Sequence, residues 1–395
     1  MRRTLRTKAK RDDETDFSLV LGGPLYQLLI RTRLARPPLE LLARRLIVIP
    51  ALAWLPLLAL TLYEGTAIGG VAVPFLKDVE VYARFFVGLP LLLVAEPLVH
   101  ARIRPLVRQF IANDLIREDA RSRFNTILER STRLRSSMAV ELSLIALVFL
   151  IGPWSRRYGL ALDADTWFSI GGETTLAGHW SSWVSAPIFQ FLLLRWLFRL
   201  ALWWRFLWRV SRLPLALHPM HPDRAGGLGF LNRSMPAFLP VLLAQSAVVS
   251  GLILGRVLAG VGTAAQYRPE IAATVVMLVL SIAGPLLFFS MPLLAAKRDA
   301  MSRFSVLANR YARDFDHKWM RPDAPAGEPP LGSADIQSMA DLDGSFAIVR
   351  GMRPVPFDLR FLVALAVVTA SPFFPLVLTV VPLEELLKRV AGMLL

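Results

Sequence analysis

The stretch LHPMHPDRAGGLGFL, residues 217–231, gathers residue types that could bind a metal ion. His218, His221 and Asp223 are possible metal ligands in it. The proline after each histidine favours extended backbone, so the two histidines do not share one helix face. No second pair of ligands stands at a recognisable spacing. A metal-dependent membrane enzyme using these three residues therefore stays a minor hypothesis, and we expect no cofactor.

The second half of this stretch has the glycines of a possible anion site. Gly226, Gly227 and Gly229 could expose backbone amides beside Arg224. The spacing matches neither the P-loop nor the dinucleotide-binding pattern, and no strand is expected before it. The ordinary interpretation is a stiff turn between two helices. The stretch is still the best single candidate for a functional loop.

Arginines recur along one side of the apolar segment 187–208 and its continuation. At 100° per residue, Arg195, Arg199 and Arg205 fall on the same side, with two further arginines following. The later arginines can extend to lipid headgroups. Arg195 and Arg199 are too far inside the segment for that, and a cation inside a bilayer costs from about 2.5 to more than 10 kcal/mol. These two residues need a partner or water.

Two glutamates inside other apolar segments are the expected partners of Arg195 and Arg199. They are Glu96, which precedes Pro97, and Glu141. One alternative is a structural cluster of ion pairs, and the other is a pathway for an anion or a proton. The sequence leaves both open.

The elements that must position these residues are membrane helices. The chain has 395 residues, of which 54% are hydrophobic, above the usual share for a soluble domain. Cysteine is absent, which excludes disulfides and cysteine-based metal sites. An all-α integral membrane fold of about seven transmembrane helices is predicted, centred on 46–62, 85–100, 138–154, 187–208, 236–255, 271–294 and 361–381.

The distribution of positive charge predicts the orientation of these helices. The net charge is +15, and 35 of the 45 lysines and arginines lie in 1–45, 101–137, 205–235 and 296–360. Positive loops stay in the cytoplasm, so the N-terminus is expected inside and the C-terminus outside. Anionic lipid headgroups then account for the charge, and no nucleic-acid partner is needed.

The regions between the spans suggest a small amount of further structure. We expect a helical cytoplasmic layer from loop 101–137 and segment 296–360, which has a Pro-rich linker, and a short periplasmic hairpin in loop 155–183. The predicted organisation is a basic cytoplasmic N-terminus with an interfacial helix (1–43), a six-span bundle (44–295) that includes loop 209–235, the segment 296–360, and a seventh span with the C-terminal tail (361–395).

Several of these segments together resemble a family of uncharacterised proteobacterial multi-pass inner-membrane proteins. The resembling segments are FSLVLGGPLYQLL, PFLKDVEVYARFFVGLPLLLVAE, PIFQFLLLRW, HPDRAGGLGFL, GSADIQSMADL and MRPVPFD. The resemblance implies a bacterial inner-membrane location and the multi-pass topology, but no reaction or ligand.

Two functions are expected from these features. The first is passage of a small solute or anion through the bundle, suggested by Arg195, Arg199 and Glu96. The second is a membrane-anchored binding, sensing or assembly partner for a cytoplasmic protein. No HExxH, GxSxG or SxxK motif is present, so an enzyme is the least supported class.

Overall fold

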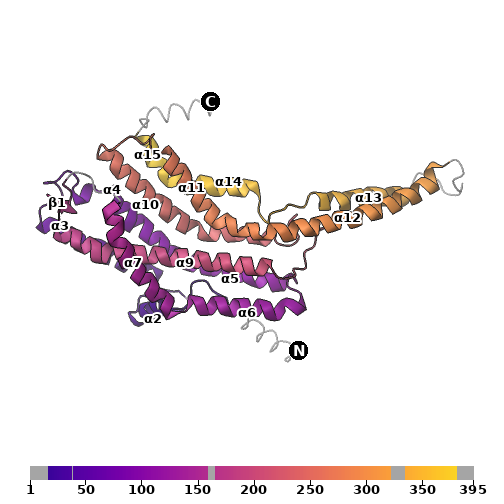
Figure 1. Cartoon of the computed structure of the whole chain (residues 1–395), viewed down its shortest axis with the longest axis horizontal. Coiled ribbons are helices and arrows are strands. Elements are labelled where there is room, and N and C mark those ends of the chain that lie inside the picture. Colours follow the sequence, from indigo (N-terminus) through magenta and orange to yellow (C-terminus); the bar gives the residue numbers. More distant parts are fainter. Residues whose placement is uncertain (1–16, 38, 159–164, 322–333, 380–395) are drawn as a thin grey trace.

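The chain folds as a long helical bundle from which one helical hairpin projects (Figure 1). The structure is a computed structural model, and it describes residues 17–37, 39–158, 165–321 and 334–379. Within those ranges, six helical stretches are long and apolar enough to cross a membrane: Leu42–Tyr63, Val79–Ala112, Leu176–Ser211, Gly229–Leu258, Arg268–Met320 and Leu359–Leu378. They correspond to six of the seven predicted spans.

The remaining predicted span, 138–154, falls on a helix whose apolar part is shorter. This helix, α7, runs from Met138 to Tyr158, and its apolar part is Met138–Leu150. A crossing of the hydrocarbon core needs about 20 apolar residues.

The first part of the chain supplies the elements around the buried arginines. They are α2 (Pro24–Arg31), α3 (Leu42–Tyr63), the 3-10 turn η1 (Phe75–Lys77), α4 (Val79–Tyr82), the π-helical η2 (Ala83–Gly88), α5 (Leu89–Ala112), α6 (Glu118–Arg135) and α7. Helix formation in loop 101–137 was predicted, and Phe124, Ile127 and Leu128 of α6 are buried as their helical spacing indicates.

The second part begins with a short hairpin at one end of the bundle. Strands β1 (Ser169–Ile170) and β2 (Glu173–Thr174) pair antiparallel, with Ser169 opposite Thr174. The turn between them contains Gly171 and Gly172, both at positive φ, which suits a tight hairpin. The predicted hairpin in loop 155–183 is confirmed.

The remaining elements complete the bundle and the projection. They are α8 (Leu176–Trp180), η3 (Ser181–Ser185), α9 (Ala186–Ser211), η4 (Gly229–Phe238), α10 (Leu239–Leu258), α11 (Arg268–Ala283), η5 (Gly284–Phe289), α12 (Ser290–Phe315), η6 (Asp316–Met320), α13 (Ala334–Arg350), α14 (Leu359–Ala370), η7 (Ser371–Phe373) and α15 (Phe374–Leu378).

Aromatic side chains fill the core near the root of the projection. The ring of Phe206 lies 5.2 Å from that of Phe17 and 6.4 Å from that of Phe110, measured between centroids. Phe110 also packs on Phe124 of α6 and Phe289 of η5. These contacts join α5, α6, α9 and η5 to the N-terminal segment, and aromatic pairs of this kind add about 0.5–1.5 kcal/mol each beyond burial.

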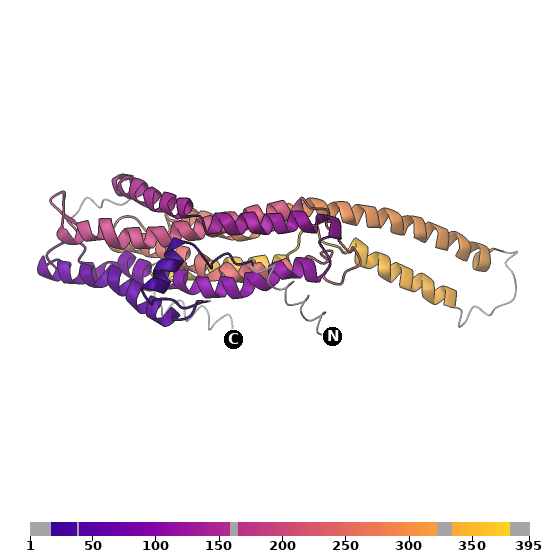
Figure 2. The same ribbon diagram turned by 90° about the horizontal axis from the view of Figure 1, so that it is seen from below.

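The helices α12 and α13 form a hairpin that extends beyond the bundle, at the end opposite β1 (Figures 1 and 2). The Tyr311 hydroxyl donates to the Asp335 carbonyl at 2.6 Å, and Lys318 Nζ lies 2.8 Å from the Asp335 carboxylate. The rings of Phe304 and Phe346 lie 6.2 Å apart. The helical structure expected in 296–360 is therefore present as a two-helix arm.

Candidate functional site

Glu96 is the centre of a buried ion-pair cluster. Its Oε2 lies 2.6 Å from Arg45 Nη1, and its Oε1 lies 3.2 Å from Arg195 Nη1 and 3.0 Å from Arg199 Nη2. All four side chains are almost completely buried. The expected pairing of Glu96 with Arg195 and Arg199 is present, and charge-assisted hydrogen bonds of this kind are the strong ones in proteins.

Glu141, at the start of α7, joins this cluster to α2. Its Oε1 lies 3.4 Å from Arg195 Nη2, and its Oε2 accepts a 2.7 Å hydrogen bond from the backbone N–H of Leu25. Gly23, at φ +93°, precedes α2, and a Cβ there would come within 2.6 Å of Glu141 Oε1. Only glycine fits this close approach without strain.

The segment 17–23 lies in the bundle beside these charges. The carbonyl of Val20 accepts from Arg199 Nη2 at 3.4 Å, and the carbonyl of Ser18 accepts from Arg135. The Ser18 hydroxyl is 2.9 Å from Nδ1 of His100. The sequence suggested an interfacial helix in this region, and helix α2 is present, but the burial of the residues before it was not anticipated.

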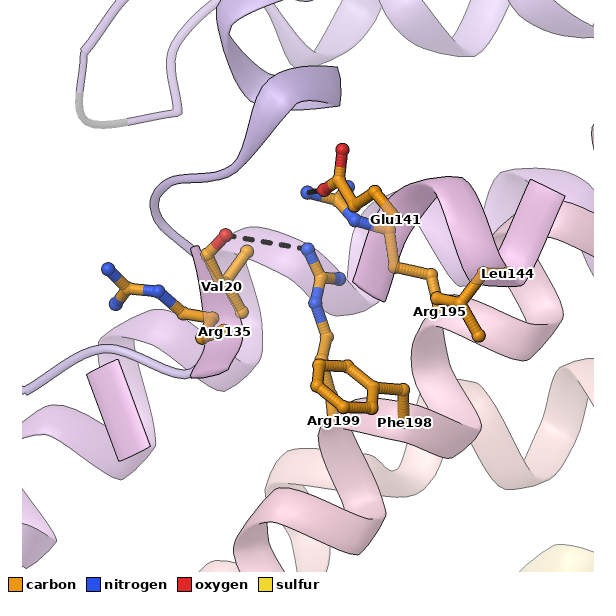
Figure 3. A pocket seen from close by; sticks show the side chains of 7 residues that line it. All are labelled: Val20, Arg135, Glu141, Leu144, Arg195, Phe198 and Arg199. Atoms are coloured by element: carbon orange, nitrogen blue, oxygen red, sulfur yellow. Dashed lines mark hydrogen bonds and ion pairs between the residues drawn. The ribbon is translucent and has the colours of Figure 1, made fainter. Parts of the chain in front are cut away.

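A small space remains in the cluster between the segment 17–23, α7 and α9. It has a volume of about 10 Å³, at the lower edge of what one water molecule needs. Figure 3 shows its lining, in which the Arg199 guanidinium points toward the Val20 carbonyl and Arg195 lies beside Glu141. The lining residues are Val20, Arg135, Glu141, Leu144, Arg195, Phe198 and Arg199.

Arg205 does not join the cluster. It is exposed further along α9, while Arg195 and Arg199 are buried on the same helix. Trp196 of the same helix is also buried, and its indole N–H donates to the Leu92 carbonyl at 2.9 Å. Arg199 additionally lies 4.7 Å above the Trp196 ring. This part of α9 is therefore surrounded by protein. The spacing of the arginines along the sequence does not predict that burial.

The loop 217–231 forms a second site, organised by Asp223. The carboxylate of Asp223 accepts from the backbone N–H groups of Ala225 at 2.8 Å, Gly227 at 3.2 Å and Gly229 at 2.8 Å. A Cβ on Gly229 would lie 2.9 Å from the Asp223 side chain. Of the three glycine amides that the sequence suggested for an anion, those of Gly227 and Gly229 donate to this carboxylate.

The histidines of the loop do not form a metal centre with Asp223. His221 Nδ1 lies 2.9 Å from Asp223 Oδ1, whereas His218 takes part through its backbone N–H, which donates to the Gly226 carbonyl at 3.1 Å. No group of three histidine, aspartate or glutamate side chains arranged to hold a metal ion is found in the described part of the chain.

Arg353 fixes the loop to the root of the hairpin. Arg224, in the left-handed region at φ +54°, presents its carbonyl to the Arg353 N–H at 2.7 Å. Arg353 Nη2 donates to the Asp223 carbonyl at 3.0 Å, and Lys297 Nζ of α12 donates to the Met352 carbonyl at 2.8 Å. We call this group the root clamp; it consists of Asp223, Arg224, Lys297, Met352 and Arg353.

The electrostatics of Asp223 match this role. Partial burial raises the pKa of its carboxyl, but the backbone N–H groups of Ala225, Gly229 and Gly227, together with His221, outweigh that effect and hold the pKa below its ordinary value. Asp223 is therefore a carboxylate under ordinary conditions.

Arg45, Arg353 and the segment 17–23 were not among the predicted site residues. Arg45 stands at the charged edge of the first span, where arginines usually contact headgroups.

Comparison of the chain with family models, curated proteins and solved structures gives no match.

Proposed function

We propose that the chain is a multi-pass protein of a bacterial inner membrane that presents the α12–α13 hairpin to a cytoplasmic protein as a docking surface. One observation carries the proposal: large apolar side chains of α12, η6 and α13 are exposed outside the bundle. They are Val306, Leu307, Met320, Ile336, Met339 and Ile348. Exposed apolar side chains on a projecting element are candidates for an interaction surface.

The root clamp supports this function, because it gives the hairpin a fixed base. Arg353 and Lys297 hold both ends of the hairpin where it leaves the bundle, and Met352 between them is buried. A pre-positioned surface loses less conformational freedom when it binds. The positive charge of segment 296–360 supports a cytoplasmic location for this arm.

Site-specific photocrosslinking in native membranes tests the docking function. A photoreactive residue at Leu307 or Met339 should give one discrete protein adduct, which is lost when the other position carries glutamate. A photoreactive residue at Ile170, exposed on the β hairpin at the opposite end, is the control and should not give that adduct. Adducts with lipid alone, or with a second copy of this chain alone, would contradict docking of another protein.

Passage of a small anion remains the second candidate function, favoured by the buried cluster. Arg45, Arg195 and Arg199 bring three positive charges against the two negative charges of Glu96 and Glu141. Proteoliposomes test it: chloride flux above that of empty liposomes, reduced in an Arg199→Lys variant, is expected for passage. Equal flux in both would remove this candidate.

A further inference from the structure

The buried cluster has an excess of positive charge. Three guanidinium groups face two carboxylates, and arginine keeps its proton in proteins. Backbone carbonyls of Val20 and Leu39 compensate part of this excess, since each accepts from one arginine. Carbonyls supply partial charge only, and a buried charge without a full counter-charge is costly.

The arginines also have donors that are not used. A guanidinium has five N–H groups. Arg199 makes two hydrogen bonds within the described part of the chain, to Val20 and to Glu96, and both come from Nη2. Its Nη1 and Nε have no acceptor among the described residues. Arg195 uses Nη1 and Nη2 toward Glu96 and Glu141, but its Nε has no acceptor there.

The small space beside these donors restricts what can bind. Its volume of about 10 Å³ is close to that of a single water site, so phosphate, sulfate and carboxylate groups do not fit. Leu144, Phe198 and the Val20 side chain form apolar parts of its wall, which strengthens electrostatic attraction inside it. Glu141 is also in the wall, but its oxygens are directed to Arg195 and to the Leu25 N–H.

We propose that one single-atom anion, of the chemical class of chloride, binds in this space between Arg195 and Arg199. The ion would complete the charge balance of the cluster and accept from the unused guanidinium N–H groups. The Arg195 and Arg199 side chains of α9 would hold it, and Val20 of the segment 17–23 forms part of the wall, so the ion would stabilise the folded cluster. The proposal is independent of the docking function.

Thermal unfolding of the full-length protein in detergent tests this site. Sodium chloride is exchanged for sodium gluconate at constant ionic strength. A ligand that binds only the folded state raises the unfolding midpoint in a saturable way. We expect the unfolding midpoint to rise by about 2 °C or more, in a saturable way, as chloride or bromide replaces gluconate. Equal midpoints in chloride and gluconate would overturn the proposal.

Two variants of α7 localise the effect. Leu144→Phe fills the space without changing any charge, whereas Leu142→Phe places the same bulk on an exposed position of the same helix. The halide-dependent rise should be lost in Leu144→Phe and kept in Leu142→Phe. A rise that persists in Leu144→Phe would place the ion elsewhere and contradict the proposal.

A second measurement decides the matter if Leu144→Phe does not fold. A crystal structure of the wild-type protein in bromide should show an anomalous scattering peak between the Arg195 and Arg199 guanidinium groups. A map with no bromide peak at that place would overturn the proposal.

Discussion

Glu96 accepts from three arginines that come from two other helices, α3 and α9. Both of its oxygens are used, since Oε2 faces Arg45 and Oε1 faces Arg195 and Arg199. The sequence could predict this pairing for Arg195 and Arg199, because cations inside apolar segments require a partner. It could not predict Arg45, because an arginine at the start of a span has an equally good partner in the headgroups.

Replacing Glu96 should be strongly destabilising. In Glu96→Gln, three buried cations lose their common counter-charge, and breaking a buried pair in this way typically costs about 3–5 kcal/mol. The expected result is a large fall in the thermal midpoint in detergent. Glu270→Gln, at an exposed position on α11, is the control and should change the midpoint little. Similar midpoints for the two variants would contradict the role of Glu96.

Asp223 makes stability of the root clamp dependent on pH. Because its pKa is lowered in the folded state, it contributes stability above the unfolded-state pKa of about 3.9, and this is lost as the pH falls through the lower folded-state pKa. Asp223→Asn should lower the free energy of unfolding at pH 7 by about 1–3 kcal/mol, which is measured as a fall in the thermal midpoint. The difference from wild type should shrink as the pH is lowered below about 4. A constant difference across that range would contradict this assignment.

At the scale of elements, the helices could be predicted better than the segments between them. Periodicity identified α6 and α12, because each presents an apolar face at helical spacing. The segment 17–23 has no such period, and its position depends on contacts with Arg135, Glu141 and Arg199, which are distant in sequence. Sequence reasoning therefore described α2 but not what precedes it.

The attachment of this segment depends on Gly23. In Gly23→Val, both the φ of +93° and the close approach of Glu141 oppose a side chain, so the segment 17–23 should leave the bundle. The chain has no cysteine, so a single Leu19→Cys in that segment reports its exposure to a maleimide. Labelling should be slow with Gly23 and at least tenfold faster with Gly23→Val.

Gly69→Ala is the matched control for that experiment. A Cβ at Gly69 meets nothing within 4 Å, so Leu19→Cys should stay protected in its presence. Equal labelling rates with Gly23→Val and with Gly69→Ala would show that the segment is not held as described.

The hairpin should lose its fixed orientation when the root clamp is broken. Arg353→Gln removes the guanidinium donor to the Asp223 carbonyl and the contact with Asp358, leaving the helices α12 and α13 intact. Distances between spin labels on the arm and on the bundle should broaden in pulsed EPR. Arg303→Gln removes only an exposed pair with Asp299 and should leave the distribution narrow. Equal widths in the two variants would contradict a clamp.

At the scale of the whole molecule, composition is enough to indicate the helical membrane architecture. Fifty-four per cent hydrophobic residues and long apolar segments predict it, and within the described residues six helices meet the length and apolarity of a span. The β hairpin and the α12–α13 arm project from opposite ends of the bundle (Figure 1), which fits the predicted placement of loop 155–183 and segment 296–360 on opposite sides. Which end faces the cytoplasm stays a prediction from the distribution of lysine and arginine.

The function rests on whether the hairpin surface is covered in the cell. The most direct test is the maleimide labelling rate of a single Leu307→Cys, compared between native membrane vesicles and the purified protein. Docking predicts labelling at least tenfold slower in native vesicles, with Ser305→Cys, on the other flank of α12, labelled at similar rates in both. Equal rates for Leu307→Cys in vesicles and in detergent would contradict the docking function.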